Sequence, residues 1–245
     1  MADKIQCSFE RYEKKYFLTP IQQEYLLSRM KPYVTADEYG KYTICSIYYD
    51  TDDWQLVRES IEKPDYKEKL RVRSYGVPTE DGKIFVELKK KCDGIVYKRR
   101  ITTDAYKAGP FLCGLEPPEH YGQIGREIAW FQNFHKTTPK VFIAYDRTAF
   151  AGTQDTELRI TFDTKIRWRD TDLDLCLGDH GKALISDDKI LMEIKMPGVC
   201  PLWLSRLLSE AGVFPVSFSK YGTCYCENIL KNKINKTQKE AFHCA

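Results

Sequence analysis

Strand-like segments with charged residues at alternate positions constrain the fold of this chain more than any other sequence feature. Three of them are Lys69-Leu70-Arg71-Val72-Arg73, Phe85-Val86-Glu87-Leu88-Lys89 and Leu158-Arg159-Ile160-Thr161-Phe162-Asp163. Residues two apart in a strand point to the same face, so Arg71 shares a face with Arg73, and Glu87 with Lys89. If these strands belong to one closed sheet, their charged faces converge on an interior that suits a polyanion carried with a divalent metal.

Turn signals separate several of these segments by only a few residues. Gly76-Val77-Pro78 and Asp81-Gly82 lie between predicted strands at 66–75 and 83–91, and Asp93-Gly94 precedes a predicted strand at 95–101. Such short links join neighbouring strands in opposite directions. The sequence therefore predicts an antiparallel sheet.

The remaining pattern adds further strands and a smaller number of helices. Strands are predicted at 7–18, 42–49, 140–147, 157–163, 165–169 and 190–195, and helical segments at 20–30, 54–60, within 103–135, 201–208 and 218–231. We expect an α+β fold in which about eight antiparallel strands close into a barrel with helices packed outside. Residues 1–231 are expected to form one domain, and 232–245 a solvated tail.

Composition limits the classes of protein that this chain can belong to. Among 245 residues, 42% are hydrophobic and the net charge is only +3, which does not suit a strongly basic nucleic-acid binder. The chain has no apolar run of about 20 residues that could span a bilayer and no apolar signal core near its start. Its nine cysteines are scattered without a CxxC pair, so we expect reduced thiols in a cytoplasmic protein and no zinc site.

Five charged blocks occur in a characteristic order along the chain. They are Phe9-Glu10-Arg11-Tyr12-Glu13-Lys14-Lys15-Tyr16, Lys69-Leu70-Arg71-Val72-Arg73, Val86-Glu87-Leu88-Lys89, Leu158-Arg159-Ile160 and Met192-Glu193-Ile194-Lys195, together with Tyr145-Asp146-Arg147 and Phe218-Ser219-Lys220-Tyr221-Gly222. From Phe9 to about Gly222, this ordered set resembles the triphosphate tunnel metalloenzymes of the CYTH-like superfamily. Within them it is most similar to the VTC domain, the polyphosphate polymerase domain.

The resemblance implies roles for individual residues. Eight cations match family positions that grip phosphates in the reaction: Lys15, Arg71, Arg73, Lys89, Lys98, Arg147, Arg159 and Lys220. Glu193 matches the glutamate that holds Mn²⁺ or Mg²⁺. Four further residues are expected beside the bound nucleotide and metal: Arg11, Glu13, Glu87 and Lys195.

Several assignments stay open at the level of sequence. Glu13 and Glu87 could orient neighbouring cations or bind metal, and Glu193 could pair with Lys195 instead of a metal. Arg99 and Arg100 offer alternative registers to Lys98. The frame Arg11-x-Glu13-x-Lys15 carries a cation where the wider superfamily often has a glutamate, which favours the VTC branch over a two-metal hydrolase.

The function implied by the resemblance is an ATP-dependent polyphosphate polymerase that transfers the γ-phosphate of ATP to a growing chain. Such a reaction needs alignment and charge neutralisation by Arg, Lys and a divalent metal, without a covalent intermediate. The alternatives are a tunnel triphosphatase and a non-catalytic polyphosphate-binding module, for which Ser217, in place of a lysine in some relatives, is a mild hint. ATP and polyphosphate are the expected partners, without specific nucleic acid. A separate membrane protein is expected for any export, and it could hold the chain peripherally at the membrane.

Overall fold

The structure, a computed structural model, describes residues 12–93 and 95–232, so Arg11 and residues 233–245 of the predicted tail lie outside the described residues. It divides into two compact units. Among the described residues, the first unit comprises 12–42, 145–166 and 185–217, and the second comprises 43–93, 95–144, 167–184 and 218–232. The chain passes between the units within three strands, β2 (Val34–Asp50), β6 (Thr138–Gly152) and β7 (Arg159–Arg169).

The strands form one large sheet, in which β1 with β9, β7 with β9, and the successive pairs from β2 to β5 run antiparallel. Its order is β10 (Pro215–Val216), β1 (Tyr12–Leu18), β9 (Ile190–Met196), β7, β6, β2, β3 (Tyr66–Tyr75), β4 (Lys83–Cys92) and β5 (Ile95–Asp104), with β8 (Lys182–Ala183) paired to β7. The antiparallel α+β fold is therefore as predicted.

The predicted closure into eight strands differs from the described sheet, which has ten strands in an open order. Two of these, β8 and β10, have only two residues each and are too short to leave a sequence pattern. The two predicted strands at 157–163 and 165–169 are one strand, β7, in which Lys165 adopts a left-handed backbone with φ of 48°.

A local sequence signal explains where the first helix begins. In α1 (Pro20–Met30), the Thr19 side chain accepts a hydrogen bond from the Gln22 N–H group, and the Gln22 side chain accepts one from the Thr19 N–H group. The other helices in the described part of the chain are α2 (Gln55–Ile61), α3 (Ala105–Leu112), α4 (Gly122–His135), α5 (Leu202–Glu210) and α6 (Lys220–Cys224). A 3₁₀ turn at Pro118–Tyr121 precedes α4, and a π-helical segment at Tyr225–Leu230 follows α6. No helix of the described residues is long and apolar enough to cross a membrane.

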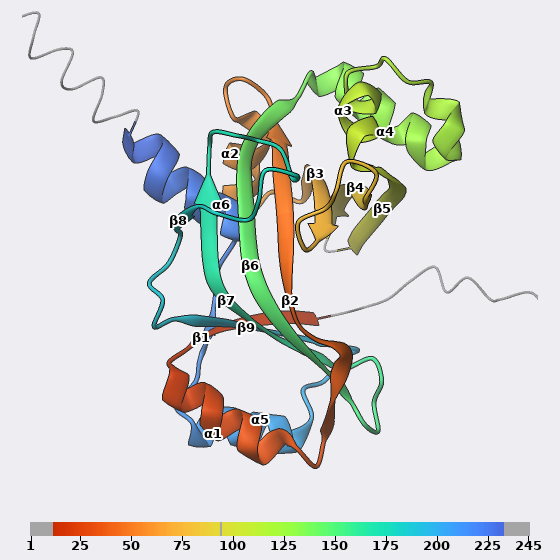
Figure 1. The fold of residues 1–245 in the computed structure, drawn as a ribbon. Coiled ribbons are helices and arrows are strands. Elements are labelled where there is room, and N and C mark those ends of the chain that lie inside the picture. Colours follow the sequence, from red (N-terminus) through yellow and green to blue (C-terminus); the bar gives the residue numbers. More distant parts are fainter. Residues whose placement is uncertain (1–11, 94, 233–245) are drawn as a thin grey trace, which may run out of the picture. The chain divides into compact units, whose positions relative to one another are not determined.

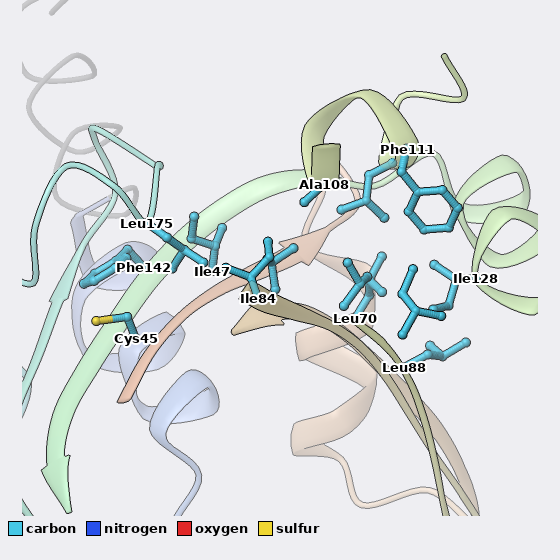
Figure 2. Packing of buried hydrophobic residues seen from close by; sticks show 14 of the residues in the cluster. Cys45, Ile47, Leu70, Ile84, Leu88, Ala108, Phe111, Ile128, Phe142 and Leu175 are labelled. Atoms are coloured by element: carbon cyan, nitrogen blue, oxygen red, sulfur yellow. The ribbon is translucent and has the colours of Figure 1, made fainter. Parts of the chain in front are cut away.

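The second unit has a hydrophobic core on one face of its strands. Leu70 of β3, Ile84 and Leu88 of β4, and Phe111 of α3 and Ile128 of α4 pack together, as Figure 2 shows. Because residues two apart share a face, the alternate residues of β3, β4 and β5 are on the opposite face. In this unit, α3 and α4 therefore cover one face of the strands (Figure 1). The side chains of Lys69, Arg71 and Glu87 belong to the other face.

The first unit has its own core, built mainly from α1, α5, β1, β7 and β9. Leu26 and Met30 of α1, Leu204 of α5, and Met192 and Ile194 of β9 are fully buried in it. The Tyr25 hydroxyl donates to Glu210 over 2.9 Å, which joins α1 to the end of α5. This packing leaves Glu193 and Lys195 on the opposite face of β9 from Met192 and Ile194.

Candidate functional site

Strand register in the second unit places cationic side chains opposite one another in rows. Lys69 of β3 pairs with Lys89 of β4, and Lys89 pairs with Lys98 of β5. Lys67 is likewise opposite Lys91. Side chains directly opposite in neighbouring strands have Cβ atoms about 4.5–5.5 Å apart, a placement that is unfavourable for like charges. We call these two sets, Lys69–Lys89–Lys98 and Lys67–Lys91, the lysine rows.

The next row is built around a buried carboxylate. Tyr48 of β2, Arg71 of β3, Glu87 of β4 and Arg100 of β5 are successive register partners. Glu87 accepts from Arg71 Nε over 2.7 Å and from Arg100 Nε over 2.8 Å, and Arg73 Nε lies 3.9 Å from it. Burial raises the pKa of Glu87, but the charges of Arg71 and Arg73 and hydrogen bonds from Arg100 and Arg71 outweigh burial and lower it to about 2. These contacts favour the first of the two predicted roles of Glu87, the orientation of neighbouring cations over metal binding, and that role stays a prediction.

The same register distinguishes among the three candidate cations of β5. Lys98 and Arg100 share the face of Lys89 and Glu87. Arg99 is on the opposite face, where its Nε donates to Glu127 of α4 over 3.0 Å. Lys98 and Arg100 thus belong to the charged face, whereas Arg99 joins the strand to a helix.

Lys220 is the first residue of α6 and is half-buried. The preceding Ser219 caps this helix by accepting from the Gly222 N–H group, and its hydroxyl accepts from Lys69 Nζ over 3.4 Å. Lys220 therefore follows a residue that contacts a member of the lysine rows.

In the first unit, two carboxylates lie around one ammonium group. Lys15 Nζ is 3.2 Å from Glu13 Oε1 and 3.9 Å from Glu193 Oε1. Lys195 Nζ is 3.9 Å from Glu13 Oε2. We call Glu13, Lys15, Glu193 and Lys195 the carboxylate cluster. Burial lowers the pKa of Lys195, and the charge of Arg147 adds to that effect, while Glu193 and Glu13 oppose it.

Arg147 joins this cluster but is largely committed to another partner. Its Nε and Nη2 atoms donate to the two carboxylate oxygens of Asp163 over 2.6 and 2.7 Å, and Nη2 also lies 3.5 Å from Glu193 Oε2. Asp163 has no exposed surface, so this bidentate pair is buried. Although burial lowers it, the pKa of Arg147 is raised well above its ordinary value by Tyr145, Asp163 and Glu193.

The donors in the carboxylate cluster fit a substrate-assisted metal site better than a closed protein cage. No group of three or more His, Cys, Asp or Glu side chains in the described ranges could hold a metal ion. Glu193 and Glu13, however, converge on Lys15 Nζ within 3.9 Å. Mg²⁺ needs only one or two protein carboxylates when phosphate oxygens and water complete its shell.

Two predicted site residues remain, Arg159 and Arg11. Arg159 of β7 is opposite Lys195 in register, and its exposed side chain forms an ion pair with Asp37 at 3.7 Å. Arg11 is not among the described residues. Sequence reasoning named Arg100 only as an alternative register to Lys98, and it assigned no role to Asp163 or to the second lysine row. The signal that could have identified Lys67 is its spacing, because it is two residues from Lys69 and shares a strand face with Lys69, Arg71 and Arg73.

Comparison with known proteins identifies the family. The family model of the VTC domain matches residues 10–228, so the chain belongs to the VTC domain family. No curated protein sequence matches the chain significantly.

Solved structures resemble this chain at low sequence identity. A candidate adenylate cyclase from Bacillus halodurans has a TM-score of 0.52 and 14% identity, over 84% of this chain and 92% of that chain. A candidate adenylyl cyclase from Hippeastrum, described as having a dominant triphosphatase activity, has a TM-score of 0.45 and 13% identity, over 85% of this chain and 92% of that chain. At 14% identity, the likeness to the protein from Bacillus halodurans shows a shared fold.

Proposed function

We propose that this protein is an ATP-dependent polyphosphate polymerase that transfers the γ-phosphate of ATP to the end of a polyphosphate chain. The observation that carries the proposal is the row Lys69–Lys89–Lys98, in which three ammonium-bearing side chains occupy directly opposed positions. Like charges in this arrangement repel one another, and a polyanion would relieve the repulsion. Membership of the VTC domain family supports a phosphate chain as that polyanion.

The proposed roles follow from the chemistry of each group. Arg71, Arg73 and Arg100 are held in orientation by Glu87 and would bind phosphate oxygens through directed N–H groups. Lys69, Lys89, Lys98 and Lys220 would act as point charges that neutralise the phosphates. The terminal phosphate of the chain is already anionic at neutral pH, so no side chain has to activate it as a nucleophile.

In the carboxylate cluster, Glu193, with Glu13, would hold Mn²⁺ or Mg²⁺. The metal would supply charge neutralisation to the phosphoryl group in transfer. Lys15, Lys195 and Arg147 surround Glu193 and Glu13 and would keep the carboxylates oriented in the ligand-free protein. Arg159, more exposed, would bind a phosphate at the periphery of this cluster.

The fate of the γ-phosphate tests the proposal. The purified protein is incubated with γ-labelled ATP, Mn²⁺ and a short polyphosphate primer, and the products are separated by size. We expect labelled polymer to form, with one mole of ADP released for each mole of labelled phosphate that enters it. Free orthophosphate without polymer would identify a triphosphatase instead, and tight polyphosphate binding without turnover would identify a binding module.

Replacing Glu193 with glutamine tests the metal assignment. Glu193→Gln keeps the shape of the side chain and removes the charge that would hold the metal beside the phosphates. We expect turnover to fall by roughly 100-fold or more, whereas metal-free ATP binds as well or better because a repulsive charge is gone. Glu227→Gln, the same substitution at a glutamate whose exposed ion pair with Lys231 lies outside the proposed site, is the control. Wild-type activity of Glu193→Gln at limiting Mn²⁺ would remove Glu193 from the metal site.

A further inference from the structure

A buried carboxylate in the second unit organises two segments that are far apart in the sequence. Asp50, at the end of β2, has no exposed surface. Its Oδ1 accepts from the N–H groups of Thr51 over 2.8 Å and Leu56 over 2.9 Å, and its Oδ2 accepts from the Val57 N–H group over 3.0 Å. These bonds attach Asp50 to the first turn of α2, where Trp54, at the N-terminal boundary, offers no side-chain cap.

A further hydrogen-bond donor to this carboxylate comes from α6. The Tyr221 hydroxyl donates to Asp50 Oδ2 over 2.8 Å, across 171 residues of sequence. Burial raises the pKa of Asp50, and the hydrogen bonds from Tyr221 and the backbone oppose that rise. Removing a donor from a buried carboxylate costs free energy, because the carboxylate then lacks a hydrogen bond. This cost favours the position of Tyr221 in which its hydroxyl reaches Asp50.

The ring of Tyr221 is constrained as well. It stacks on Tyr48 with centroids 4.6 Å apart and an interplanar angle of 13°. Tyr48 Oη is in turn 3.4 Å from Nη1 of Arg71, on the charged face. Tyr221 is therefore held at its hydroxyl by Asp50 and at its ring by a residue that contacts a proposed phosphate-binding arginine.

We propose that Tyr221, anchored by Asp50, is a positioning residue for Lys220. Lys220 precedes Tyr221 directly, and Ser219 on its other side is tied to Lys69 and caps α6. Both neighbours of Lys220 are thus fixed to β2 and β3 of the same unit. The inference rests on the proposed function, because it gives these contacts a role in phosphate binding. The capping of α2 by Asp50 would not by itself require Tyr221.

The test is a double-mutant cycle on binding, with no turnover required. Dissociation constants for inorganic tripolyphosphate are measured by calorimetry for the wild type, Tyr221→Phe, Lys220→Ala and the double variant. Tyr221→Phe keeps the stacked ring and removes only the hydroxyl. We expect Lys220→Ala to weaken binding by roughly tenfold and Tyr221→Phe by roughly fivefold. The double variant should be no weaker than Lys220→Ala alone, within about twofold.

Two controls separate positioning from stability. Tyr225 lies in the adjacent π-helical segment, and its ring packs near Trp54. Tyr225→Phe removes only its hydroxyl and should bind tripolyphosphate like the wild type. Circular dichroism melting identifies a temperature at which each variant is folded. If Tyr221→Phe does not fold, Ser219→Ala tests the same anchored segment, with the same non-additivity expected.

The outcomes also separate this inference from the proposed function. Wild-type affinity in Tyr221→Phe, or additive losses in the double variant, would overturn the positioning role and leave the polymerase proposal standing. Wild-type affinity in Lys220→Ala would do the same. If the wild type itself does not bind tripolyphosphate, both the proposed function and the inference fail.

Discussion

Glu87 lies among three guanidinium groups, so its protonation affects the stability of the second unit. Its pKa in the folded protein is about 2, below the ordinary 4.5. The unfolded state therefore binds more protons between these pH values, and stability rises with pH in that window. We expect a contribution on the order of 3 kcal/mol that is complete above about pH 5 and is lost as the pH falls toward about 2.

Urea unfolding of the wild type and Glu87→Gln at about pH 3 and pH 6 measures this contribution. The wild type should lose more stability than the variant on going to the lower pH, because glutamine does not titrate. An equal loss in both proteins would show that Glu87 does not carry this pH dependence.

Arg147 and Arg159 were predicted to have the same role, but their surroundings predict different consequences of mutation. Arg147→Ala would leave the fully buried carboxylate of Asp163 without its bidentate partner. We expect a loss of about 3–5 kcal/mol of unfolding free energy, against less than about 1 kcal/mol for Arg159→Ala, whose side chain is 58% exposed. Chemical denaturation compares the two variants. Similar small losses would show that Asp163 is satisfied without Arg147.

At the level of secondary structure, the hairpin of β4 and β5 with the adjoining β3 forms an amphipathic layer. Leu70, Leu88 and Ile101 pack into the core, and the lysine rows occupy the other face. Burial lowers the pKa of Lys67, and the charges of Lys91 and Lys63 lower it further. The second row therefore extends the cationic face beyond Lys69 and Lys89.

This second row should favour long phosphate chains. The double variant Lys67→Gln/Lys91→Gln is expected to weaken binding of long polyphosphate by roughly tenfold or more, and of tripolyphosphate by less than about threefold, because only a longer chain reaches both rows. Competition binding with size-fractionated polyphosphate measures the ratio. Lys90→Gln, which alters the opposite face where Lys90 pairs with Glu68, is the control. Equal losses for both ligands would contradict a role in chain length.

At the scale of the whole molecule, the net charge of +3 conceals an uneven distribution of charge. Salt screens repulsion within the lysine rows and also screens their attraction for phosphate. Raising NaCl from about 50 to 500 mM should therefore stabilise the ligand-free protein and weaken polyphosphate binding. Melting temperature and binding measured over one salt series test the pair of effects. A melting temperature that falls with salt would show that ion pairs outweigh repulsion.

Much of this molecule follows from local sequence. The alternation in β3 predicted which residues share a face, and the helix predicted at 20–30 is α1, whose start Thr19 caps. Both depend on interactions within a few residues. The order of charged blocks was sufficient to indicate the VTC domain family, which the family match over residues 10–228 confirms. The single domain, the cytoplasmic location and the roles of the site residues stay predictions.

Long-range partners could not be read from the same patterns. The sequence does not show that Asp163 takes both donor atoms of Arg147, that Arg99 turns to Glu127, or that Asp50 reaches Tyr221. Nor does it show that the described sheet has an open order of ten strands. Alternation sets the face of a residue through the backbone geometry of its own strand. The partner that a charge meets depends on register and packing between distant segments, which only the folded chain brings together.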